Sequence, residues 1–138
     1  MSGIAFTAQG VPHAFRDKPR VRRWLHSVAQ DHGRSIDVLN LVLLSDEDLR
    51  QYNMRFLDRH YFTDVIAFDN SAGTAVNGDI LISYHRTKEN ASGFSVSHQE
   101  ELRRVMLHGL LHLLGHQDRS EEQKASMRRI EDAHLKRY

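Results

Sequence analysis

The sequence predicts an α+β fold: a small mixed β-sheet of about four strands packed with helices, with a histidine-bearing helix at its centre. Three observations predict it. Length and composition (138 residues, 40% hydrophobic, 27% charged) suit one globular domain over residues 1–138. Apolar strand-like runs alternate with stretches of helical periodicity. Finally, the leucine-rich stretch "HGLLHLLGHQD" (108–118) contains three histidines and ends on an aspartate.

The first half of the chain alternates helical and strand patterns. Residues 19–32 predict a helix that Gly33 can end, because one apolar stripe runs along it: Val21, Trp24, Leu25, Val28 and Ala29. Next, "IDVLNLVLLS" (36–45) predicts a strand buried on both faces. Ser45 can cap a helix from Asp46 to about Phe56, and a weak strand pattern covers residues 3–9.

Two further strands are expected in the middle of the chain. They are "TDVIAFD" (63–69) and "DILISY" (79–84), and the small and polar "NSAGTAVNG" (70–78) between them is expected to form a turn. A short polar helix is expected at 85–91.

Capping-box patterns mark the two last helices. Ser97 followed by Glu100 opens a long helix through Leu114, which Gly115 can end. Ser120 followed by Gln123 repeats the pattern for a terminal helix.

Charge and composition exclude several classes of protein. The net charge is +1 and there is no cysteine, so neither a strongly cationic protein nor a thiolate zinc site is expected. No apolar run has membrane length and no leader pattern occurs, so we expect a cytoplasmic protein without a membrane partner. Basic residues cluster in two segments, which are expected to be solvated helix faces and alternatively phosphate-binding: Arg16–Arg23 and Lys124–Arg137.

A metal site is predicted on the long helix. His108 and His112 are one turn apart on a helix that is apolar nearly all round, the geometry in which H-x-x-x-H binds one metal ion. A third ligand must follow the chain reversal at Gly115. Asp118 is the favoured candidate, and His116 is the alternative if the helix continues straight.

Two neighbouring positions bear on the chemistry. Gly109 stands where H-E-x-x-H peptidases have their catalytic glutamate, which argues against a peptidase mechanism. Glu101 lies on the same helix face as His108. We expect an ordinary solvated or capping glutamate there, and alternatively a residue that orients a histidine.

Three blocks resemble a known family in their order along the chain. "HGLLHLLGHQD" resembles the H-G-x-L-H-L-x-G-Y-D-H signature of the YbeY endoribonucleases, which mature bacterial ribosomal RNA. "FTDVIAFD" (62–69) resembles the family's P-T-D-V-L-S-F-P block, and "GDILIS" (78–83) resembles its G-D-I-x-I-S strand. The resemblance spans roughly residues 36–120.

The resemblance implies a zinc-dependent endoribonuclease specific for single-stranded RNA. Such an enzyme processes the 3′ end of small-subunit ribosomal RNA and serves ribosome quality control, with the small ribosomal subunit as partner. The family's three histidines map onto His108, His112 and Asp118, which would hold one Zn²⁺ ion and make its site less positive than three histidines would. Whether water or the RNA 2′-hydroxyl attacks the phosphate is left open, as is the oligomeric state.

An arginine is expected to stabilise charge on the reacting phosphate. The family's arginine aligns with Leu57 here, and the flanking Arg55 and Arg59 are the candidates to replace it; both can equally be surface arginines. His60 has no assigned role, and Asp64 is expected to cap a turn, or alternatively to position the loop over the metal. Two alternative functions remain: a ribosome-binding assembly factor with a structural metal, and a zinc amide or peptide hydrolase.

Overall fold

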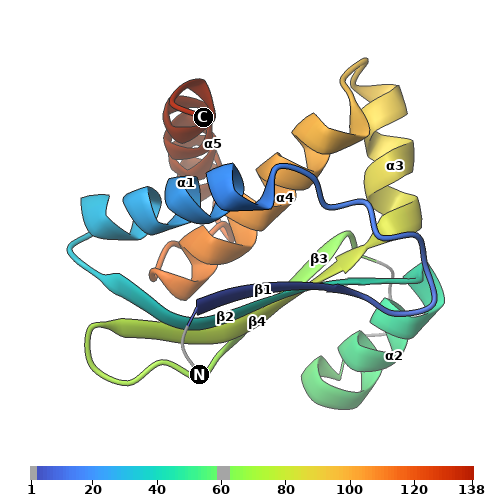
Figure 1. Cartoon of the computed structure of the whole chain (residues 1–138), viewed down its shortest axis with the longest axis horizontal. Coiled ribbons are helices and arrows are strands. Elements are labelled where there is room, and N and C mark those ends of the chain that lie inside the picture. The colour runs from blue at the N-terminus through green and yellow to red at the C-terminus, as the bar shows by residue number, and fades with distance from the viewer. Residues whose placement is uncertain (1–2, 59–62) are drawn as a thin grey trace.

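One mixed sheet forms the framework of the protein (Figure 1). The computed structural model describes residues 3–58 and 63–138. Within them the strands are β1 (Gly3–Ala8), β2 (Ser35–Leu44), β3 (Val65–Asp69) and β4 (Ala75–Ser83), in the spatial order β1-β2-β4-β3. β1, β2 and β4 are parallel, whereas β3 runs antiparallel to β4. The predicted mixed sheet and its weakly marked first strand are therefore confirmed.

Five helices are described: α1 (Lys18–Asp31), α2 (Asp46–Leu57), α3 (Tyr84–Gly93), α4 (His98–Leu113) and α5 (Glu121–Lys136). α1 and α4 pack on one face of the sheet, α5 lies against α4, and α2 lies on the opposite face (Figure 1). The main core lies between the sheet and α1 and α4, where alternate strand residues such as Leu39, Leu41, Ile80 and Ile82 are fully buried.

Helix α4 is the central helix, as its apolar character predicts. Its backbone approaches β4 so closely that a Cβ atom on Gly109 would lie 2.8 Å from Ile80 Cγ2. Gly78 makes a similar approach, because a Cβ there would lie 2.6 Å from the Phe68 carbonyl oxygen and 3.0 Å from Leu113 Cδ1. Two glycines thus let α4 and the two antiparallel strands lie close together.

The capping patterns fix where three helices begin. Ser45, Ser97 and Ser120 each accept a hydrogen bond from the backbone N–H three residues on, at 3.0–3.1 Å. At α5 the box is reciprocal, because Gln123 Oε1 accepts from the N–H of Ser120. α3 covers the short polar helix expected at 85–91.

The segment 70–78 differs from its expectation. β4 begins at Ala75, so the second half of the expected turn is strand. Gly78 is part of this turn-like composition, and it is small because its backbone packs tightly against Phe68 and Leu113.

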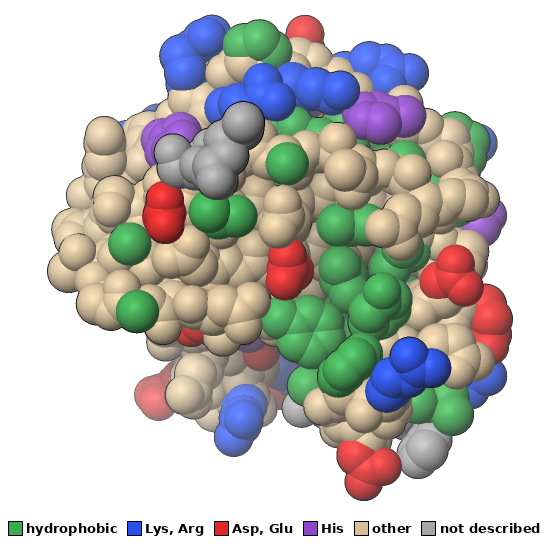
Figure 2. Space-filling model, turned by 60° about the horizontal axis from the view of Figure 1, so that its bottom comes forward, with side chains coloured by type: hydrophobic (Ala, Val, Ile, Leu, Met, Phe, Trp, Pro, Cys, Tyr) green, Lys and Arg blue, Asp and Glu red, His purple; other side chains and the backbone are tan. Residues whose placement is uncertain are grey.

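The α2 face of the sheet is only partly covered, and hydrophobic side chains gather on it (Figure 2). A groove of about 410 Å³ lies between α2 and the sheet, and its apolar lining includes Tyr52, Phe56 and Phe68. Phe56 is 57% exposed. None of the described helices combines the length and the apolar character that crossing a bilayer would require.

Candidate metal centre

A cleft of about 580 Å³ opens beside the second half of α4. Its walls come from the end of α2, from the start of β3, from α4 and from the turn that follows α4. The three predicted metal ligands, His108, His112 and Asp118, all line this cleft.

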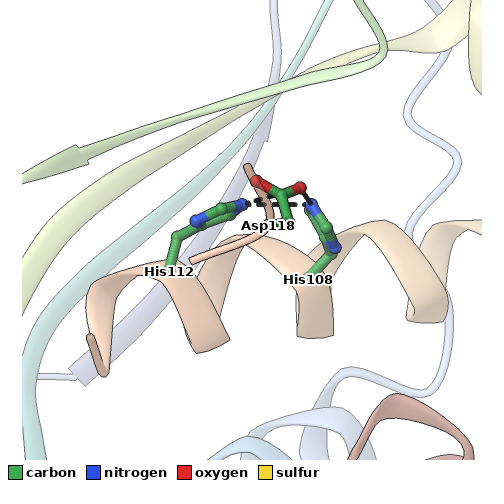
Figure 3. A group of neighbouring side chains, drawn as sticks. All are labelled: His108, His112 and Asp118. Atoms are coloured by element: carbon green, nitrogen blue, oxygen red, sulfur yellow. Dashed lines mark hydrogen bonds and ion pairs between the residues drawn. The ribbon is translucent and has the colours of Figure 1, made fainter. Parts of the chain in front are cut away.

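Their side chains converge on one point (Figure 3). Asp118 Oδ2 lies 3.2 Å from His108 Nε2 and 3.5 Å from His112 Nε2, and the two Nε2 atoms are 3.1 Å apart. One potential ligand atom from each residue lies within 4.8 Å of the others. Because these atoms carry lone pairs, their convergence is repulsive unless a proton or a cation lies among them. Two imidazoles and a carboxylate are also a donor set that zinc uses in proteins, so the residues fit the ion.

The turn after α4 brings Asp118 back to the histidines. Gly115 adopts a positive φ of 103°, and its N–H donates to His112 O at 3.0 Å. The N–H of His116 donates to Leu111 O at 3.0 Å. These two bonds form a Schellman motif, which ends a helix and reverses the chain. The glycine stop predicted at Gly115 is therefore confirmed.

The same reversal takes the alternative ligand away from the cleft. His116 does not continue the stripe of His108 and His112; its Nε2 lies 2.8 Å from His32 Nε2, beside the end of α1. Of the two candidates for the third position, Asp118 is the one that the fold brings to the histidines.

Sequence reasoning missed Glu131, which lies on α5 behind His108. His108 Nδ1 donates to Glu131 Oε2 at 2.5 Å, and Arg104 donates to Glu131 Oε1 at 3.3 Å. Glu131 is only 6% exposed. Since the proton is on Nδ1, the Nε2 lone pair of His108 faces the cleft, the arrangement typical of metal-ligating histidines. The available signal was its place on the buried face of α5, in line with Met127 and His134.

The pKa values of His108 and His112 are shifted in opposite directions. Burial alone lowers the pKa of His108, but the hydrogen bond to Glu131 and the charges of Glu131 and Asp118 raise it above its ordinary value. Burial, followed by the charge of His108, lowers the pKa of His112. The lowered pKa of His112 favours the neutral form that binds a cation, whereas the raised pKa of His108 makes protons stronger competitors for its Nε2.

Glu101 does not match the expectation of a solvated residue. It lies on α4 and is only 3% exposed, and its Oε1 has no hydrogen-bond partner among the described residues. Burial, together with the negative charges of Asp64 and Glu131, raises the pKa of Glu101 to about 7. The expectation was wrong because the packing of other segments on α4 buries this position, which the periodicity of the helix alone does not show.

Of the two predicted arginines, the structure describes only Arg55. Arg55 lines a separate pocket on the far side of α2, with Tyr52 and Phe56, and does not line the histidine cleft. Arg59 and His60 lie outside the described residues. Leu57, which takes the place of the family's arginine, lines the cleft, and so does Asp64.

Arg119 is a second residue that sequence reasoning missed. It follows Asp118 directly and lines the same cleft. Among the described residues that line this cleft, Arg119 is the only arginine. Its side chain is exposed. Its adjacency to the third predicted ligand was the only local signal, and it is a weak one, because arginines are common on surfaces.

The packing of Gly109 bears on the peptidase alternative. A Cβ atom at this position would lie 2.8 Å from Ile80 Cγ2, so a glutamate there would require the Ile80 side chain to move. The position that supplies the base in H-E-x-x-H peptidases is here used for contact between α4 and β4.

This chain is similar to several known proteins over most of its length. The family model described as Endoribonuclease YbeY matches residues 9–138. The Endoribonuclease YbeY of Cytophaga hutchinsonii is 42% identical over 133 residues, which cover 96% of this chain and 93% of that protein. The Endoribonuclease YbeY of Porphyromonas gingivalis is 36% identical over 140 residues, covering 98% and 89%.

A solved structure supports the fold as well. The solution structure of TM1509 from Thermotoga maritima superposes with a TM-score of 0.66 at 21% identity, covering 96% of this chain and 87% of that one. At this identity the similarity concerns the fold alone. The sequence matches reach further, because they span nearly the whole chain and include the histidine helix and the turn after it. This chain belongs to the endoribonuclease YbeY family.

Proposed function

We propose that this protein is a zinc-dependent endoribonuclease that cleaves single-stranded RNA in the cleft beside α4. The observation that carries the proposal is the convergence of His108, His112 and Asp118 on one point at the wall of an open cleft. Membership of a family whose members are named endoribonucleases supplies the reaction class.

His108, His112 and Asp118 would hold one ion in this cleft, leaving a coordination position toward the solvent. Zinc, when bound, supplies Lewis-acid stabilisation of negative charge at a phosphoryl oxygen. Glu131 keeps the proton of His108 on Nδ1, so that Nε2 remains directed to the ion. Because Asp118 contributes a negative charge, the site is less positive than one with three imidazoles.

The remaining cleft residues are suited to hold the RNA. The exposed Arg119 can contact a phosphate with two parallel hydrogen bonds. Arg59 remains a proposed phosphate contact from the segment before β3, and Arg55 could reach RNA only outside the cleft. An open cleft of about 580 Å³ has room for a nucleotide of a flexible strand, which favours a single-stranded substrate.

The cellular role that we propose follows the family resemblance. The substrate is ribosomal RNA, cleaved at the 3′ end of the small-subunit RNA. The same activity would serve quality control of the small ribosomal subunit in the cytoplasm.

The test uses the full chain purified without an affinity tag. Wild-type protein, His112→Ala and the control His85→Ala are compared on a fluorescent single-stranded RNA, before and after a chelator and after zinc is returned. His85 lies on α3 and does not line the cleft. We expect cleavage by the wild type and His85→Ala, its loss with chelator, and its return with zinc.

Two results would contradict the proposal. Cleavage that persists unchanged in His112→Ala would mean that the histidines do not carry the reaction. Zinc removal that unfolds the protein, with no cleavage at any stage, would instead favour a structural metal in a ribosome assembly factor.

A further inference from the structure

A second pair of imidazoles lies outside the cleft, between the end of α1 and the turn after α4. His32 Nε2 and His116 Nε2 are 2.8 Å apart, and the two rings are nearly perpendicular at 86°. Neither residue lines the cleft of His108 and His112. The separation of their nitrogens is close to the 3.1 Å between the two cleft histidines.

The tautomer of His32 is fixed by its neighbour. His32 Nδ1 lies 2.8 Å from Val28 O, and a carbonyl oxygen only accepts, so Nδ1 carries the proton. The Nε2 atom of His32 therefore presents a lone pair to His116. An imidazole held in this way by a backbone carbonyl is prepared to bind a metal ion through its other nitrogen.

Both histidines stand on helix ends of defined shape. His32 is the C-cap of α1, where Gly33 and Arg34 donate to Gln30 O and Ala29 O, the same Schellman pattern that ends α4. The two turns are also tied together without the histidines, because Arg34 donates to Leu113 O at 3.1 Å. The pair is thus presented by a fixed part of the backbone.

We propose that His32 and His116 bind a second divalent transition-metal ion, distinct from that of the cleft, with water completing its coordination. Two nitrogens on one tetrahedral zinc ion lie about 3.4 Å apart, so the rings need to separate by only about half an ångström. Among the described residues, the only group of three side chains with ligand atoms within 4.8 Å of one another is that of His108. The imidazole of His134 also lies nearby, with its ring centre 6.0 Å from that of His32. Two neutral imidazoles suit Zn²⁺, Ni²⁺ and Cu²⁺, and not the oxygen-seeking Mg²⁺ or Ca²⁺.

Such an ion would link α1 to the turn that carries Asp118, two residues beyond His116. It would therefore restrain the residue that completes the cleft cluster without entering the cleft. Binding at this pair does not depend on the proposed ribonuclease activity.

The experiment counts ions. Equilibrium dialysis of the full chain against Zn²⁺ is compared for the wild type, His32→Ala, His116→Tyr, His112→Ala and the control His26→Ala. His26 lies on α1, the helix that His32 caps. His116→Tyr introduces the residue of the family signature and provides a second variant in case His32→Ala does not fold. We expect two ions per chain in the wild type and in His26→Ala, and one ion in each of the other three variants.

The two sites fail separately in this design. A single ion in the wild type that is lost in His112→Ala but kept in His32→Ala and His116→Tyr overturns the second site, leaves the proposed cleft site intact, and makes the pair an ordinary hydrogen bond. Two ions in all variants of the pair would equally overturn it, by placing the second ion elsewhere.

Discussion

His108 and Glu131 form a 2.5 Å hydrogen bond across the interface of α4 and α5. The same carboxylate accepts from Arg104, so it is held between a cation and an imidazole in a largely buried position. Helix α5 therefore sets the hydrogen bonding of a cleft histidine, although no residue of α5 lines the cleft.

Replacing this carboxylate tests the relationship. Glu131→Gln keeps the shape but removes the charge, so we expect the pKa of His108 to fall, because Glu131 raises it in the wild type. Loss of such a support typically weakens metal affinity by about 10- to 100-fold. Zinc affinity and the His108 titration measured by NMR check both effects. Asp132→Asn is the control, since Asp132 contacts Arg104 at 3.7 Å. Unchanged zinc affinity in Glu131→Gln would refute the role of Glu131 in orienting His108 toward the ion.

Arg119 should matter more for RNA cleavage than Arg55, because Arg119 lines the cleft and Arg55 lines a pocket beyond α2. For Arg119→Ala we expect a loss in kcat/KM of about tenfold or more, the effect of losing roughly 1.4 kcal/mol of phosphate binding. Arg55→Ala should lose less. Steady-state cleavage of single-stranded RNA by both variants, with Arg59→Ala alongside, measures the three. A larger loss in Arg55→Ala would show that RNA crosses α2.

The buried carboxyl of Glu101 should make the free energy of unfolding depend on pH. Its pKa is raised from 4.5 to about 7 in the folded protein, so the unfolded chain releases this proton first and the free energy of unfolding falls as pH rises through that window. Glu101→Gln cannot ionise. The variant should therefore be more stable than the wild type at pH 8, by at most about 3 kcal/mol, with the difference shrinking toward pH 4.

Urea unfolding at several pH values measures this effect. Glu100→Gln, which changes the exposed residue just before Glu101, is the control. Because this variant keeps Glu101, the difference between its free energy of unfolding and that of the wild type should not grow with pH. A constant difference between Glu101→Gln and the wild type at every pH would mean that the carboxyl does not titrate in this window.

Gly109→Ala should destabilise the fold. Its new Cβ would lie 2.8 Å from Ile80 Cγ2, and overpacking of this kind costs about 1–3 kcal/mol. Ile80→Val in the same chain removes Cδ1, which would lie 3.1 Å from the new Cβ, and should recover part of that loss although Cγ2 remains. Gly93→Ala is the matched control, since a Cβ there meets nothing within 4 Å. Thermal unfolding of the three variants decides: equal stability of Gly109→Ala and wild type would contradict the close packing.

Local signals in the sequence were sufficient for most of the fold. The serine caps at Ser45, Ser97 and Ser120 act over three residues, and the glycine at Gly115 acts on its own backbone, so each can be recognised without knowledge of the rest of the chain. His108, His112 and Asp118 belong to the same class, because eleven residues contain the whole cluster.

What could not be predicted depends on contacts between distant segments. Glu131 contacts His108 only because α5 folds back on α4, and the sequence around either residue has no pattern that predicts the contact. Glu101 has the local sequence of a solvated residue, and only the fold as a whole buries it. In β4 a strand was mistaken for a turn, because a glycine usually indicates a turn. Gly78 is instead small so that Leu113 and Phe68 can pack against its backbone.

The Schellman reversal at Gly115 has a consequence for how this site can change in evolution. His108 and His112 are rooted in a packed helix, but Asp118 stands on an exposed turn beyond it. A mutation at 118 therefore alters the chemistry of the cluster without disturbing any buried neighbour. We expect this third position to accept either a carboxylate or an imidazole, which would change the charge of the cluster and leave the hydrophobic core as it is.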